Sequence, residues 1–127
     1  MTGECVTCDA MGTIERHHPA GRKNDPRFVV EVCVPCHRIL TDWQRAIGMP
    51  LRRGASSDGD RMRASAVGAL DVWQLWMYRH FDPSNPFFYV PRLVARCLAL
   101  SADEEMGCHA WTVDPQIALS AVVQHDQ

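Results

Sequence analysis

Residues 5–37 read CVTCDAMGTIERHHPAGRKNDPRFVVEVCVPCH and carry a Cys-x-x-Cys pair at each end. Two residues between cysteines let the chain curl so that both sulfur atoms reach one ion, and two such pairs supply the four thiolates of a tetrahedral zinc site. Disulfide bonds and redox chemistry are the alternatives for cysteines in this pattern. We predict a structural zinc site formed by two pairs, Cys5 with Cys8 and Cys33 with Cys36.

The segment between the two cysteine pairs has the pattern of a β-hairpin. Residues 13–17 (TIERH) and 27–33 (RFVVEVC) are rich in β-branched or aromatic side chains and predict two strands. Residues 19–26 (PAGRKNDP) have the composition of the loop that joins antiparallel strands. A zinc ion bound to both pairs would hold the start of the first strand against the end of the second.

Helices are expected in the rest of the chain. Ile39, Leu40, Trp43 and Ile47 recur at helical spacing over residues 37–48, and Gly48 is placed to end that helix. Residues 49–60 have the composition of a linker, and further helices are expected over residues 61–81, 90–104 and 114–125. The fold class is therefore α+β, with a zinc-stabilised module over residues 1–48, a linker over residues 49–60 and a helical extension over residues 61–127. We expect the extension to pack on or beside the module.

Two residues of the expected extension are assigned to its interior. Helical spacing places Trp73 on the same face as Val67 and Met77, so we expect it in the core. Cys97 is expected to be a buried helix residue. The remaining cysteine and histidine positions, His80, Cys97, Cys108 and His109, match no spacing of metal ligands, so no second metal site is predicted.

Charge is distributed unevenly along the 127 residues, whose formal net charge is -2. Residues 1–54 hold eight Lys and Arg against six Asp and Glu, whereas residues 55–127 hold five against nine. The first part is therefore the better place to look for contact with a polyanion. The N-terminal residues lack the features of a signal peptide, and Arg92 and Arg96 interrupt the longest apolar run, so we expect a soluble, cytoplasmic protein without a membrane partner.

Three histidines lie close to the predicted metal site. His17 and His18 end the first predicted strand, and His37 follows the last cysteine of the second pair. A hairpin packed on a helix in this order brings His37 near the other two. Because neighbouring side chains on a strand point to opposite faces, His17 and His18 are expected to perform different tasks.

The first cysteine pair, the segment ERHHPAGR (residues 15–22) and the segment CVPCH (residues 33–37) together resemble the HNH endonuclease family, with its ββα-metal fold. The resemblance covers about the first 47 residues. It implies hydrolysis of phosphodiester bonds in DNA with one divalent cation, Mg²⁺ or another, beside the structural zinc. It further implies that His17 and His37 bind that cation and that His18 is the general base that deprotonates water.

Three more residues are candidates in the same region. Glu15 lies on the strand face of His17 and could orient a histidine as a hydrogen-bond acceptor, and similar family members carry an acid there. Arg22 either contacts the scissile phosphate or leaving group or is a solvated loop charge. Phe28 stands about where the family has the asparagine that ties its loop by hydrogen bonds, and Asn24 is the candidate to replace it.

Three functions from different classes follow from these features. The leading expectation is a metal-dependent DNA endonuclease or nickase. The alternative is a catalytically weak, zinc-stabilised nucleic-acid-binding or adaptor module, which the low positive charge and the displaced asparagine favour. A third function is a protein-interaction module whose helical half binds a protein partner or forms a homodimer.

Overall fold

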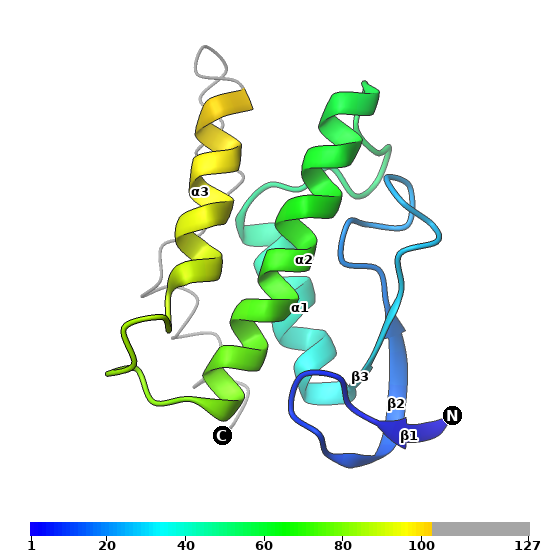
Figure 1. Cartoon of the computed structure of the whole chain (residues 1–127). Coiled ribbons are helices and arrows are strands. Elements are labelled where there is room, and N and C mark those ends of the chain that lie inside the picture. Colours follow the sequence, from blue (N-terminus) through cyan, green and yellow to red (C-terminus); the bar gives the residue numbers. More distant parts are fainter. Residues whose placement is uncertain (103–127) are drawn as a thin grey trace.

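The computed structural model of the chain describes residues 1–102, which form a small antiparallel sheet followed by helices. The strands are β1 (Thr2–Glu4), β2 (Met11–His17) and β3 (Val30–Cys33), in the order β1-β2-β3. The helices are α1 (Val34–Ala46), α2 (Asp58–His80) and α3 (Val90–Ala102), and Figure 1 shows α2 between α3 and the sheet. The predicted α+β class is confirmed, while the helix expected over residues 114–125 lies outside the described residues.

The predicted hairpin consists of β2 and β3, in which Ile14 pairs with Cys33 and His17 pairs with Val30. Strand β3 begins three residues later than expected because the chain first makes a turn, in which the Phe28 N–H donates to the Asp25 carbonyl oxygen at 3.3 Å. Strand β1 was not predicted, since three residues are too few to display a strand pattern.

Helix α1 begins within the second cysteine pair, three residues before the predicted start. Cys33 is the N-cap, and Pro35 occupies the first turn, where a missing N–H leaves no hydrogen bond unmade. The predicted apolar face, which includes Ile39 and Trp43, is buried. Gly48 has a φ of 72°, a left-handed conformation that glycine adopts without strain and that suits the end of a helix.

Helix α2 begins at Asp58, so the predicted linker ends earlier, at residue 57. The Ser57 hydroxyl accepts a hydrogen bond from the Asp60 N–H at 3.1 Å and caps the helix. Asp58 and Asp60 in the first turn complement the positive end of the helix dipole. Residues 58–60 (DGD) were counted in the linker by composition, yet they form the first turn of the helix.

The prediction that Trp73 lies in the core is wrong, because 44% of the residue's surface is exposed to solvent. Trp73 follows Val67 by six residues, which rotates it about 240° around a helix that turns 100° per residue. Asp71 and Gln74 occupy the core-facing positions instead, and both are buried. The inward face of α2 is therefore partly polar, which a search for apolar periodicity does not detect.

These buried polar groups attach α3 to α2. The Gln74 side-chain amide donates to the Phe88 carbonyl oxygen at 2.8 Å, and its oxygen accepts from the Arg92 N–H at 3.2 Å. The Arg92 guanidinium donates to the Asp71 carboxylate at 2.5 Å and lies 4.9 Å from the centre of the Trp43 ring. Burial raises the pKa of Asp71 to about 6, although the charge of Arg92 acts in the opposite direction.

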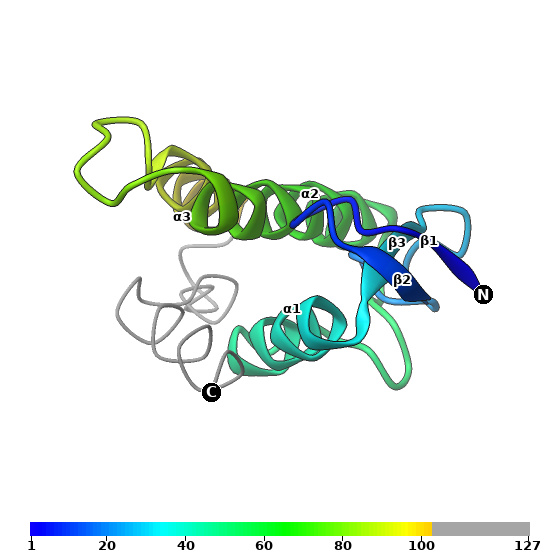
Figure 2. The ribbon, with the colours of Figure 1, turned by 90° about the horizontal axis from the view of Figure 1, so that it is seen from below.

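Helices α1 and α2 share one core cluster of buried side chains, which includes Leu40, Trp43, Val67 and Leu75. Figure 2 shows the two helices in separate layers with β2 and β3 beside one end of them. The predicted burial of Cys97 is wrong: it is exposed, because the inward face of α3 passes through Arg92 and Ala95. Among residues 1–102, no helix combines the length and apolar character needed to cross a bilayer.

Helix α2 also touches the loop after β2 at Gly68. A Cβ atom at this position would lie 2.2 Å from the carbonyl oxygen of Pro19, which is backbone and cannot move aside cheaply. The absence of a side chain at Gly68 thus lets α2 pack directly on the loop that follows His18.

We expect Gly68→Ala to lower the free energy of unfolding by about 1–3 kcal/mol, since the added methyl group overpacks this contact. Gly59→Ala is the matched control on the same helix, because a Cβ at Gly59 meets no atom within 4 Å. Urea denaturation of both variants measures the difference. Equal stability of the two variants would contradict the tight contact between α2 and the loop.

Candidate functional site

The four cysteine sulfur atoms of the two Cys-x-x-Cys pairs all lie within 4.8 Å of one another. The Cys8 and Cys33 sulfur atoms are 3.7 Å apart, whereas a disulfide bond would require about 2.05 Å. Four sulfur atoms at about 2.3 Å from a central zinc ion would be about 3.8 Å apart along each edge of the tetrahedron. The predicted cluster is confirmed, and its geometry suits a tetrahedral metal ion such as zinc.

The surroundings of the cysteines differ from one thiol to the next. Burial strongly raises the pKa of the Cys36 thiol, and the neighbouring Arg79 acts to lower it. For Cys5 the effect of burial is outweighed by hydrogen bonds, including one with the Thr7 hydroxyl at 3.2 Å, and its pKa falls to about 6. Whether each of these thiols is ionised therefore depends on the hydrogen-bond donors and charges around its sulfur atom.

The end of β2 and the first turn of α1 bring two of the predicted histidines together. The rings of His17 and His37 meet edge to face, with their centroids 5.1 Å apart. The Glu15 carboxylate lies 3.0 Å from Nδ1 of His37, which fixes the ring and leaves Nε2 for another partner. His17 is buried, whereas the side chain of His37 is partly open to solvent.

Both members of the His17–His18 pair are held in the neutral form at neutral pH. Burial, with smaller effects of His37 and His18, lowers the pKa of His17 to about 4. Burial also lowers the pKa of His18, followed by the charges of Arg22 and Arg16 and by His37.

Gln44 holds the backbone immediately after His17 and was not singled out from the sequence. Its side-chain amide donates to the carbonyl oxygens of His18 and Pro19, at 2.7 and 2.9 Å. The sequence did contain a signal for Gln44: it is a polar residue next to Trp43, on the side of α1 that is buried. Together with Gly68 of α2, it fixes the position of the His18 backbone.

Asn24 ties the same loop to the segment that precedes α2. Its buried side-chain amide donates to the carbonyl oxygens of Ala20 and Pro50, at 2.7 and 3.1 Å. Its oxygen accepts from the Ala55 N–H at 2.6 Å. Phe28 packs against the core instead, which leaves Asn24 as the asparagine that closes the loop by hydrogen bonds.

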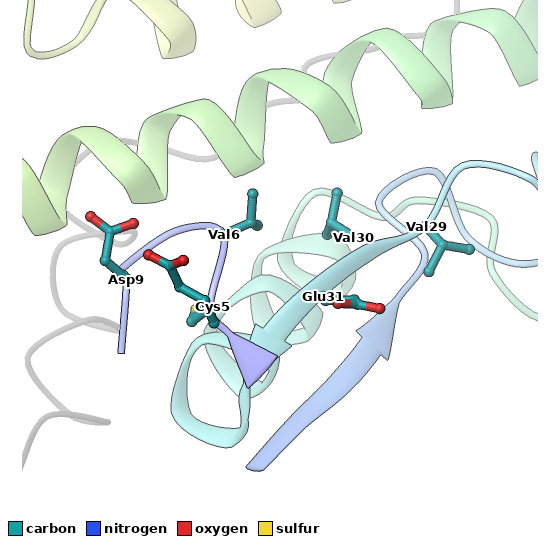
Figure 3. A pocket seen from close by; sticks show the side chains of 7 residues that line it. Cys5, Val6, Asp9, Val29, Val30 and Glu31 are labelled. Carbon is teal, nitrogen blue, oxygen red and sulfur yellow. The ribbon is translucent and has the colours of Figure 1, made fainter. Parts of the chain in front are cut away.

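Two hollows in the surface differ sharply in charge. One, of about 420 Å³, is lined by Glu15, His37, Arg38, Thr41, Asp42 and Arg45. The other, of about 490 Å³, is lined by Glu4, Cys5, Val6, Asp9, Val29, Val30 and Glu31, and Figure 3 shows its acidic and valine side chains. Three carboxylates and no basic residue line the second hollow, so it would repel a phosphate, whereas the first has two arginines and two carboxylates beside His37.

We expect Asn24→Ala to lower the free energy of unfolding by about 2 kcal/mol or more, because one buried and two partly buried backbone groups lose their partner. Asn85→Ala serves as the control. Its side chain accepts one exposed hydrogen bond, from the Phe87 N–H, and should cost about 1 kcal/mol or less. Thermal and urea unfolding measure both, and a smaller effect at Asn24 than at Asn85 would contradict its role in the loop.

For the cysteine cluster, Cys36→Ser should reduce the metal content of the purified protein and lower its melting temperature. Cys97→Ser removes an exposed thiol outside the cluster and should leave both unchanged. Elemental analysis by mass spectrometry gives the metal content per chain. Wild-type protein that carries no metal after expression in zinc-supplemented medium would argue against a metal site.

No protein-family model, curated protein or solved structure matches the chain. Any functional inference therefore rests on the geometry described above.

Proposed function

We propose that this chain is a metal-dependent endonuclease or nickase that hydrolyses phosphodiester bonds in DNA. The observation that carries the proposal is the contact of His17, His37 and Glu15 beside the cluster of four cysteines. We further propose that the cluster binds a structural zinc ion, which would hold the hairpin and α1 in the arrangement that brings these side chains together.

The donor set suits a catalytic divalent cation held by His17 and His37. Both are imidazoles, and the carboxylate on Nδ1 of His37 orients the ring in the way that partners of metal-binding histidines commonly do. A divalent cation at this place would supply charge stabilisation to a phosphate oxygen, and Mg²⁺, which prefers oxygen ligands, would take most of its ligands from water and the phosphate. With only two protein side chains engaged, room would be left for the substrate.

His18 is the proposed proton acceptor. In hydrolysis the water oxygen forms a bond to phosphorus while its proton passes to the neutral imidazole. The P–O ester bond breaks with its electron pair on the leaving oxygen, which takes up a proton from solvent. The hydrogen bonds from Gln44 and the packing of Gly68 hold this backbone in place, so that the main chain that carries the imidazole does not have to be ordered during the reaction. Arg22, whose charge acts on His18, would then contact the phosphate or the leaving oxygen.

A non-catalytic zinc-stabilised nucleic-acid-binding or adaptor module is the second candidate. The strong burial of His17, at 3% exposed, favours it because a catalytic cation must exchange with solvent to reach its ligands. Arg38 and Arg45 line the hollow beside His37 together with Glu15 and Asp42, so its charge is mixed rather than strongly basic. Cleavage activity separates the two candidates.

We expect the wild-type protein to nick supercoiled plasmid DNA in Mg²⁺ or Mn²⁺ and not in excess EDTA. His18→Ala should slow nicking by about 10²–10⁴-fold, because it removes the proton acceptor. Glu15→Gln should reduce the rate less, since it weakens only the orientation of His37. Zinc content and circular dichroism of each variant serve as the controls for folding.

One result would count against the nuclease, and another would count against the role of His18 alone. Zinc-loaded, folded wild-type protein that leaves DNA intact with every divalent metal, yet binds it in a gel-shift assay, would favour the binding module. Cleavage that persists at the wild-type rate in His18→Ala would show that another group accepts the proton.

A further inference from the structure

The last turn of α2 reaches both cysteine pairs, although it lies more than forty residues further along the chain. The Arg79 guanidinium donates through Nη2 to the sulfur of Cys36, at 3.7 Å. On the other pair, Nε2 of His80 lies 3.0 Å from the carbonyl oxygen of Thr7 and 3.4 Å from the Asp9 carboxylate. Figure 1 shows this end of α2 beside the loop that carries the first pair.

The charge of a loaded cluster explains why such contacts matter. Four thiolates around a divalent ion carry a net charge of −2, and Cys5 and Cys36 are fully buried. Charge in a buried position is unfavourable unless a partner compensates it. A guanidinium that donates an N–H to a sulfur atom compensates part of it and withdraws electron density from that thiolate.

We propose that Arg79 is a positioning and charge-compensating residue of the cysteine-bound metal, so that α2 controls how tightly the metal is held. The inference rests on the proposed zinc at the four cysteines. His80 holds the helix end in register by its contact with Thr7, and its ring packs on Trp76 with centroids 5.2 Å apart. Metal retention is therefore a property of the helical part of the chain as well as of the cysteines.

The test compares Arg79→Gln, Arg79→Lys and the control Arg61→Gln, which removes the same charge near the opposite end of α2, where Arg61 donates to the Ala55 carbonyl oxygen. Competition with a zinc chelator should give a zinc dissociation constant about 10- to 100-fold higher for Arg79→Gln, as is typical when a hydrogen-bond partner of a metal ligand is lost. Arg79→Lys should fall between Arg79→Gln and the wild type, and Arg61→Gln should match the wild type.

A spectroscopic readout separates charge compensation from a general loss of stability. In the cobalt-substituted protein, loss of the positively charged donor, which the shorter and neutral glutamine does not replace, should move the sulfur-to-cobalt charge-transfer band to lower energy in Arg79→Gln and by less in Arg79→Lys. Weaker zinc binding with an unchanged band would overturn the proposal, because it would show that Arg79 acts only through folding. If Arg79→Gln does not fold, the lysine variant decides: a displaced band supports the proposal and an unchanged band overturns it.

The outcomes also separate this inference from the proposed metal itself. Wild-type protein that binds neither zinc nor cobalt would refute the metal site on which the inference depends. Wild-type protein that binds both, with Arg79 variants indistinguishable from it in affinity and spectrum, would refute the role of Arg79 alone.

Discussion

The convergence of four cysteine sulfur atoms is the constraint on which the rest of the molecule depends. It joins the turn after β1 to the junction of β3 with α1, two places that are separated by the whole hairpin. Because Cys33 is the last residue of β3 and also the N-cap of α1, fixing its position fixes the direction in which the helix leaves the sheet. The contact between His17 and His37 follows from that direction, since one ring ends β2 and the other lies one turn into α1.

The loop between His18 and Val30 is held by a different kind of constraint. It contains no regular structure, yet its backbone receives hydrogen bonds from α1 through Gln44, and Asn24 connects it to the chain that precedes α2. The Gln44 and Asn24 side chains are both buried, so breaking these hydrogen bonds would leave their amide groups without a partner. A loop of this kind can hold the backbone of a histidine in one position without belonging to a helix or a strand.

The sequence predicted those elements that have strong local signals. The cysteine pairs, β2, the apolar face of α1 and the position of α3 all depend on spacing or on residue type, and the expected contact of His37 with the histidine pair followed from their order along the chain. Trp73 and Cys97 were misplaced because the inward faces of α2 and α3 carry Asp71, Gln74 and Arg92, a polar set that apolar periodicity cannot reveal. Gln44, Gly68 and Arg79 were missed for a related reason, since each matters through one contact with a residue distant in sequence. The roles of the histidines in catalysis stay predictions.

Helix α2 contacts the loop after His18 through Gly68 and the cysteine cluster through Arg79, which donates to the Cys36 sulfur. These two positions are eleven residues apart. Eleven residues make about three full turns of an α-helix and span about 16 Å, so both contacts lie on one face. The number of residues between Gly68 and Arg79 therefore matters as much as which residues they are. Deleting or inserting a single residue between these positions would turn one contact about 100° away from its partner, so this stretch should tolerate substitution on its outer face far better than any change of length.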